Sequence, residues 1–320
     1  MGHVGSQPWP AEHAASVDAP LRLAVVVCFQ NEAEHLPTLL ESIDAQTEPA
    51  EQLMLVDDGS SDRSPRIVAD YAATRPAATV LTRARRDEVR DRLADAPEWR
   101  AFQAGVAALG EPWDVVAKLD GDLKLPASLF ADVRARLRED PRLGVTGAWF
   151  SEATRDGGQV RNAHPAVHVR GANKFYRRAC YEQISPIPAQ LGWDTFDELR
   201  ARAGGWRTET FAASEGDVVH LRPTGSFDGR LRGYRRWGMC AWAYGAHPLG
   251  VLAGAVRRAR QRPVVLGGVS YLIGWGGAAL GGYPRLEPET RAFARREDLR
   301  RIRSAGRRLL RVEPKAAGRA

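Results

Sequence analysis

Residues 53–62 read LMLVDDGSSD, and this short stretch shows a pattern that recurs in the chain, an apolar run followed by a polar loop. Its first four residues are apolar and suit a strand that is buried on both faces, while the polar residues after them suit a loop. Residues 23–29 read LAVVVCF, a longer apolar run of the same kind, and Gln30-Asn31-Glu32 follow it directly. Continuous apolar runs that end in polar loops are typical of strands in a parallel sheet.

Helical periodicity fills the gaps between these strands. Leu36, Leu39, Leu40 and Ile43 recur at helical spacing, and Pro37 suits the first turn of a helix. Three further strands are predicted at residues 79–82, 115–119 and 143–150. Strands that alternate with helices predict an α/β fold, in which a mainly parallel sheet carries helices on both faces.

Three polar clusters directly follow three of these strands: Asn31 with Glu32, Asp57 with Asp58, and Asp120 with Asp122. In open parallel sheets, ligands bind beyond the carboxyl ends of strands, so we expect the clusters to meet at one rim. Asp120 and Asp122 offer hard oxygen ligands for Mg²⁺ or Mn²⁺, and such an ion could clamp a diphosphate as a leaving group. Asp57 could accept hydrogen bonds from a nucleoside base or ribose.

Taken together, these motifs resemble the family-two glycosyltransferases. The motifs are residues 28–32 (CFQNE), 56–62 (VDDGSSD) and 119–122 (LDGD). The resemblance covers residues 21–225 and implies the A-type glycosyltransferase fold, which is Rossmann-like. It also implies a metal-dependent hexosyltransferase that uses a nucleotide-diphosphate sugar and inverts the sugar carbon.

The resemblance implies roles for the residues at the donor side. Asn31 and Glu32 would lie on the first loop of the nucleotide pocket. Asp57 matches the acid that contacts the nucleobase, and Asp58 lies beside it. A donor pocket built from two adjacent loops is therefore expected.

The metal and diphosphate side involves residues further along the chain. Asp120 and Asp122 match the DxD pair, which contacts ribose and the metal–diphosphate, and His220 matches a further metal ligand of some relatives. Lys118 could neutralise phosphate or point to solvent. Arg236 resembles the arginine of a QxxRW motif that lacks its glutamine here, so we expect single addition, with Arg236 near the diphosphate or acceptor.

The acceptor side is expected in the middle of the chain. Residues 171–177 (GANKFYR) resemble the segment that opens a helix at the acceptor site. Asp194 stands twelve residues before Trp206, the family's spacing for its catalytic Asp, although Trp193 replaces the usual Glu. The resemblance thus implies Asp194 as the base that takes the acceptor proton, with Asp197 as the competing candidate.

Composition narrows the class of protein. The 320 residues include 46 Lys and Arg against 39 Asp and Glu, a net charge of +7. An apolar content of 44% excludes a wholly disordered or collagen-like chain. Cys28, Cys180 and Cys240 have no metal-ligand spacing, which favours a reducing compartment and a cytoplasmic location.

The last hundred residues bear on membrane association. Residues 237–256 and 264–283 each lack Asp, Glu, Lys and Arg, over about the minimum length of a bilayer span. The second run is rich in glycine, which adds little hydrophobicity. If both runs crossed the membrane and the catalytic domain lay in the cytosol, the arginines of residues 257–262 would lie on the outer side, against the positive-inside tendency. We expect interfacial or re-entrant helices or a helical oligomer face, with a buried helical subdomain as the alternative.

The basic excess lies in the tail, where residues 291–311 hold nine Arg against Glu297 and Asp298. Either a solvated helix or a cationic face for an anionic membrane or lipid-linked phosphate explains it. Nucleic acid is not expected, because no aromatic-interleaved basic platform accompanies the tail. The expected organisation is a disordered leader at residues 1–20 and a catalytic domain at residues 21–225. An apolar helical region at residues 226–286 and a basic helical tail at residues 287–320 would follow.

The sequence therefore predicts an inverting glycosyltransferase at the cytosolic membrane face, acting on a lipid-linked glycan or surface polysaccharide precursor. A nucleotidyltransferase of similar fold is one alternative, although its Gly-rich entry loop is missing. A non-catalytic, glycosyltransferase-like binding or scaffold protein is the other. A NAD-dependent oxidoreductase does not fit, because no GxGxxG follows the first strand.

Overall fold

The computed structural model describes residues 20–84, 95–110, 112–153, 158–162, 164–222 and 229–310. The chain divides into two compact units, residues 1–224 and 225–320. Apart from its last residue, the expected leader at residues 1–20 lies outside the described part of the chain.

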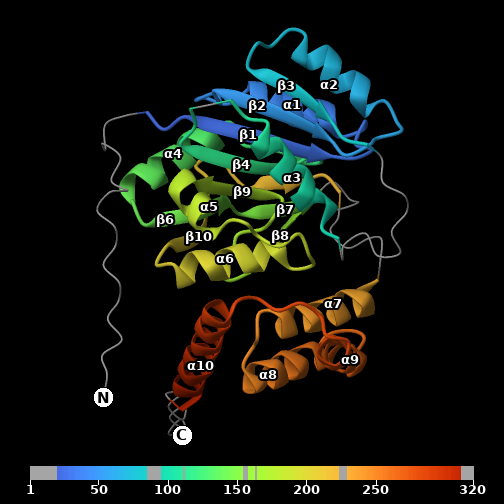
Figure 1. The fold of residues 1–320 in the computed structure, drawn as a ribbon, viewed down its shortest axis with the longest axis vertical. Coiled ribbons are helices and arrows are strands. Elements are labelled where there is room, and N and C mark those ends of the chain that lie inside the picture. Colours follow the sequence, from blue (N-terminus) through green and yellow to red (C-terminus); the bar gives the residue numbers. More distant parts are fainter. Residues whose placement is uncertain are drawn as a thin grey trace, which may run out of the picture. The chain divides into compact units, whose positions relative to one another are not determined.

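The first unit alternates strands and helices (Figure 1). Its elements are β1 (Leu23–Phe29), α1 (Leu36–Asp44), β2 (Gln52–Asp57), α2 (Ser64–Ala72), β3 (Ala78–Thr82), α3 (Pro97–Ala107), β4 (Val115–Asp120), β5 (Leu123–Lys124), α4 (Leu129–Glu139), β6 (Leu143–Ala148), β7 (Phe150–Ala153), β8 (Gln159–Arg161), β9 (Asn173–Arg177), α5 (Arg178–Ile184), α6 (Trp193–Ala203), β10 (Arg207–Phe211) and β11 (Val218–His220). The predicted order of strands and helices is therefore present.

Seven strands form the main sheet, in the order β10-β6-β9-β4-β1-β2-β3. The pairs β1–β2, β1–β4, β2–β3 and β6–β10 are parallel, while β9 runs antiparallel to both β4 and β6. A smaller sheet has the order β5-β11-β7-β8. This arrangement confirms the predicted α/β fold with a mainly parallel sheet.

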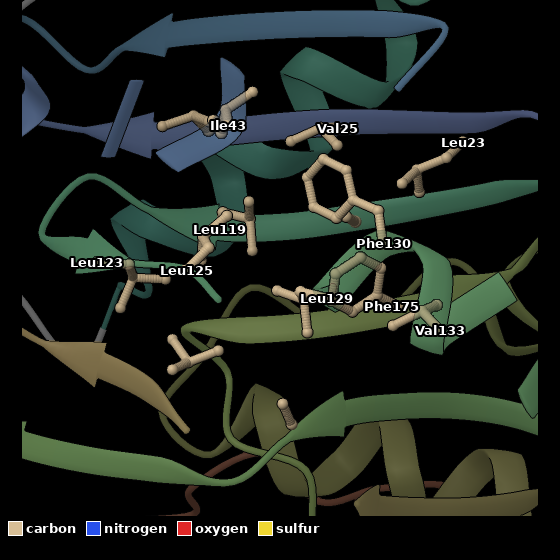
Figure 2. Packing of buried hydrophobic residues seen from close by; sticks show 14 of the residues in the cluster. Leu23, Val25, Ile43, Leu119, Leu123, Leu125, Leu129, Phe130, Val133 and Phe175 are labelled. Atoms are coloured by element: carbon tan, nitrogen blue, oxygen red, sulfur yellow. The ribbon is translucent and has the colours of Figure 1, made fainter. Parts of the chain in front are cut away.

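Side chains of β1 alternate between two cores, which explains its continuous apolar run. Leu23 and Val25 pack toward α4, where Figure 2 shows them beside Phe130. Ala24 and Val26 point to the other face, into a core built around Trp99 of α3. Helices therefore cover both faces of the sheet and leave the strand ends as the place for polar loops.

Two segments differ from the sequence prediction. The single strand expected at residues 143–150 is split, because β6 ends at Ala148 and β7 begins at Phe150 in the smaller sheet. Residues 171–177 do not open a helix, since Asn173–Arg177 is strand β9 and α5 begins only at Arg178. All five residues of β9 are buried, and the strand lies between β4 and β6 in the centre of the sheet. Its polar sequence does not indicate this position.

The described part of the second unit is helical. Its elements are α7 (Arg230–Ala243), α8 (Pro248–Ala259), α9 (Leu266–Leu280) and α10 (Pro288–Leu310). Glycines bring α7 and α9 into backbone contact, because a Cβ on Gly238 would overlap the carbonyl oxygen of Tyr271. Among the described helices, none combines the length and apolar character that crossing a bilayer requires.

Candidate active site

The loops after β1 and β2 are held together by hydrogen bonds. Asn31 adopts a left-handed backbone conformation with φ 56°, and its amide N donates to Ser60 Oγ at 2.9 Å. Its side-chain Oδ1 accepts from the amide N of Ser61 at 2.7 Å. The amide N of Glu32 donates to Ser64 Oγ at 2.9 Å. The two predicted donor loops therefore form one framework at the carboxyl ends of their strands.

Asp57 and Asp58 play different parts within this framework. Asp57 is buried, and its Oδ1 accepts from the amide N of Ser60 at 2.9 Å, which fixes the turn. Asp58 Oδ1 accepts from Arg83 Nη1 at 2.6 Å. Asp57 is thereby oriented by its own loop, whereas an arginine neutralises Asp58.

The next polar turn carries Asp120 and Asp122. Gly121 between them is required by space, since a Cβ there would lie 2.7 Å from Phe29 Cβ and 3.2 Å from Glu32 Cγ. This close approach brings the DxD pair against the loop that follows β1. All three predicted clusters therefore meet at one rim of the sheet.

Lys118 is fully buried and pairs with Asp120, so it does not point to solvent. Burial opposes the charge of this lysine, but the charge of Asp120 outweighs burial and raises the pKa of Lys118. The ammonium group is therefore held protonated beside the first carboxylate of the DxD pair. In this position it orients Asp120 and adds positive charge to the rim.

Asp122 forms a contact with His220, the residue at the end of β11. His220 Nε2 lies 3.2 Å from Asp122 Oδ2, and Arg222 Nε lies 3.9 Å from the same oxygen. Burial works against the charge of Asp122, but the hydrogen bond and charge of His220 outweigh it and lower the pKa of this carboxyl.

Glu32 lies beside this pair. It forms an ion pair with Arg222, yet burial and the nearby charge of Asp122 raise the pKa of Glu32 to about 7. The edge of the rim is thus crowded with carboxylates.

The donor atoms of Asp122 and His220 suit a divalent cation. Two neighbouring ligands on an octahedral ion with bonds of about 2.1 Å stand about 3 Å apart, close to the 3.2 Å seen here. A carboxylate oxygen and an imidazole nitrogen suit Mn²⁺, and the remaining positions would fall to water and phosphate. Within the described ranges, no three His, Cys, Asp or Glu side chains gather closely enough to hold an ion by themselves.

Asp194 and the DxD turn approach the same short segment, residues 171–172. Asp194 is partly exposed in the first turn of α6. A Cβ on Gly171 would lie 3.2 Å from Asp194 Cβ and 2.9 Å from the ring of Trp193. The next carbonyl, that of Ala172, accepts from the amide N of Asp120 at 3.0 Å. The structure therefore brings the predicted base and the predicted metal turn to the same short segment.

Asp197 has a different environment from Asp194. It is fully buried, accepts from Lys174 Nζ at 2.9 Å and accepts from the Tyr176 hydroxyl at 2.6 Å. Burial raises the pKa of Asp197 to about 6 despite the opposing charge of Lys174. Asp197 therefore faces the interior, where an acceptor sugar has no access in this conformation.

Sequence reasoning missed the role of Lys174. Its Nζ is fully buried and donates to the carbonyl of Asp194 at 2.7 Å and to Glu198 Oε1 at 3.2 Å. Lys174 and Lys118 are direct cross-strand partners on β9 and β4. The signal was available, because the chain has only four lysines among 46 basic residues and uses two of them here.

Arg236, the remaining predicted residue, lies on α7 in the second unit, where it is buried. All the other predicted site residues lie in the first unit.

Comparison with known proteins gives the class. The profile of glycosyl transferase family 2 matches residues 24–189, more than half of the chain. The chain therefore belongs to glycosyl transferase family 2, as its motifs predict. A search of curated proteins found no sequence match.

Solved glycosyltransferases share the fold. A mannosyltransferase from Pyrobaculum calidifontis, PcManGT in complex with GDP-Man and Mn²⁺, is 16% identical with a TM-score of 0.50, over 93% of this chain and 83% of that one. TarS from S. aureus is 13% identical with a TM-score of 0.50, over 83% of this chain and 44% of that one. GalNAc-T7 with UDP, GalNAc and Mn²⁺ is 13% identical with a TM-score of 0.56, over 76% and 52%. The chain thus spans about half the length of the last two and has the A-type glycosyltransferase fold.

Proposed function

We propose that this chain is an inverting, metal-dependent glycosyltransferase that moves a hexose from a nucleotide-diphosphate sugar to an acceptor hydroxyl. One observation carries the proposal: a partly exposed residue, Asp194, and the turn that bears Asp120 and Asp122 both approach the same short segment, residues 171–172. Donor activation and proton acceptance need to be adjacent in such a transfer, and this rim offers both. Family membership and the shared fold support the same reaction class.

Donor binding falls to the framework of the first two loops. Asn31 and Asp57 lie where a nucleoside would approach the strand ends. Asp122 and His220 would hold Mg²⁺ or Mn²⁺, which supplies positive charge to the diphosphate leaving group when bound. Lys118 keeps Asp120 oriented toward the same region. The chain's own residues thus supply orientation and charge on one side of the sugar.

Asp194 acts on the other side of the sugar. As the acceptor oxygen forms its bond to the sugar carbon, the bond from that carbon to the diphosphate breaks, and Asp194 takes the hydroxyl proton. The nucleoside diphosphate leaves with the bonding electron pair. Attack opposite the leaving group inverts the sugar carbon.

The acceptor that we propose is a lipid-linked glycan or a surface polysaccharide precursor. The cationic second unit supports it, since such acceptors carry phosphate and lie at a membrane surface. This acceptor also places the protein at the cytosolic face of a membrane.

Calorimetric titration of the full chain tests the donor site. UDP-, GDP- and dTDP-sugars are added with and without Mn²⁺, and we expect one nucleotide class to bind only when the metal is present. A folded protein that binds none of them under either condition overturns the proposal and favours a scaffold role.

A further inference from the structure

The outward face of α9 is apolar, which reverses the usual pattern of a helix in a soluble unit. Small residues and one tyrosine face inward, including Gly267, Gly268 and Tyr271. The outward side chains are aliphatic, and Leu280 is 93% exposed. They are Leu266, Val269, Leu272, Ile273 and Leu280, and Val265, directly before the helix, is exposed as well. Exposed apolar patches of this kind mark interaction surfaces.

Helix α8 shows the same reversal. Leu249, Leu252 and Val256 recur at helical spacing and are each exposed, whereas Val251 and Ala255 are buried. Val264, in the turn before α9, is exposed as well. The exposed aliphatic residues of α8, of α9 and of this turn are together called the apolar outer face.

The segment that carries the apolar outer face is basic, and one carboxylate approaches it from α10, where Asp298 lies against Gly250 of α8. Residues 229–286 contain nine Arg and not one Asp or Glu. Arg257 in the last turn of α8, and Arg260 and Arg262 in the turn that follows, are all exposed. Val256 and Val264 of the apolar outer face belong to the same stretch of chain. An apolar surface with an arginine border matches the acyl chains and anionic headgroups of a lipid leaflet.

We propose that the apolar outer face docks the second unit onto an anionic lipid surface, with α8 and α9 lying in the headgroup region. Both helices are too short to cross a bilayer, and short apolar helices with basic flanks suit the interface. A second copy fits less well, because a twofold contact through this face would bring its two arginine borders together. Residues 229–286 hold no carboxylate to offset that repulsion, and Asp298, which approaches α8 from α10, already accepts from the amide N of His247.

Vesicle sedimentation of the full chain tests the proposal. The probes are vesicles of phosphatidylcholine alone and vesicles rich in phosphatidylglycerol. We expect strong binding to the second kind and weak binding to the first. The triple variant Arg257→Gln, Arg260→Gln, Arg262→Gln should bind about a hundredfold more weakly, because each arginine near an anionic surface contributes about a fivefold factor.

Matched variants separate this surface from general charge. Arg296→Gln, Arg300→Gln and Arg303→Gln remove the same charge from exposed positions of α10 and should weaken binding far less. The double variant Leu252→Ser, Ile273→Ser should also lose at least about tenfold in binding, given the apolar area removed. Val160→Ser with Val167→Ser, two exposed positions of the first unit, serves as its control.

Two results would overturn the proposal. One is an equal loss of vesicle binding in the α10 triple variant and in the triple variant of Arg257, Arg260 and Arg262. Net charge alone would then explain the binding. The other is a protein that binds neither kind of vesicle. If that protein is a dimer and the Leu252→Ser, Ile273→Ser variant is a monomer, the apolar outer face is covered by a second copy of the chain. Thermal unfolding of each variant shows that the fold is kept.

Discussion

Two carboxylates one helical turn apart have opposite surroundings, and this difference decides which of them can be a base. Asp194 is partly exposed, while Asp197 is buried against Lys174 and Tyr176. We expect Asp194→Asn to keep metal-dependent nucleotide binding and to lose about a hundredfold to ten-thousandfold in transfer rate, the usual contribution of a general base. Single-turnover transfer and calorimetry measure the two effects separately.

The matched control for this change is Glu139→Gln, which removes a carboxylate from an exposed position on α4. It should transfer at the rate of the unchanged protein. Transfer by Asp194→Asn at that same rate would show that the base lies elsewhere.

The metal ligands make a second prediction at this scale. Asp122→Asn and His220→Gln each remove one member of the pair whose donor atoms are 3.2 Å apart. We expect each change to erase most of the difference between nucleotide titrations with and without Mn²⁺, because the ion loses a direct ligand. A metal response unchanged in both variants would rule out this pair as the ligand set.

Single residues differ in how well the sequence predicts them. Asp120 and Asp122 follow from their place after a buried strand, and the structure brings them to the rim with the two earlier clusters. The surroundings of Asp194 and Asp197 could not be predicted, because the groups that enclose Asp197 come from a strand twenty residues earlier. Burial of that kind depends on pairing between distant segments.

At the scale of elements, Lys174 links strand β9 to helix α6. It contacts the carboxylates of Asp197 and Glu198 and the carbonyl of Asp194. We expect Lys174→Met to lower the free energy of unfolding by about 3–5 kcal/mol, because two buried carboxylates would lose their counter-charge. Chemical denaturation measures this loss.

The control is Lys124→Met, which removes a lysine from an exposed position on β5. Adding Asp197→Asn to Lys174→Met should cost less than the sum of the two single changes, since they act on one network. A Lys174→Met protein as stable as Lys124→Met would show that the cluster does not hold α6 in place.

Elements with apolar sequences were predicted well, and those with polar ones were not. The strand at Leu23–Phe29 reads as strand from its valines alone, and it is present with those bounds. The β9 sequence NKFYR carries polar residues at its first two positions, which satisfy partners inside the protein rather than water. Local hydrophobicity cannot distinguish a buried, paired lysine from a solvated one.

At the scale of the whole chain, charge divides between the two units. Residues 225–320 hold 20 Lys and Arg against six Asp and Glu, a net charge of +14. The remaining residues, with 26 against 33, carry −7. The modest overall charge of +7 therefore conceals an acidic unit that bears the rim and a basic unit that bears the apolar outer face. A basic unit of this kind attracts any polyanion at low salt, whether lipid or nucleic acid.

Salt dependence separates these two partners. Binding to single-stranded DNA would rest on phosphate contacts, and about five such contacts lose more than a thousandfold in affinity over a tenfold rise in salt. Binding to phosphatidylglycerol vesicles adds burial of the apolar outer face, which salt does not screen. We expect any DNA binding, measured by fluorescence anisotropy, to vanish at high salt, while vesicle binding falls only to the weak level expected for phosphatidylcholine. The Leu252→Ser, Ile273→Ser variant should lose this residual vesicle binding and leave DNA binding unchanged. Vesicle and DNA binding that fall in parallel would mean that charge alone drives both.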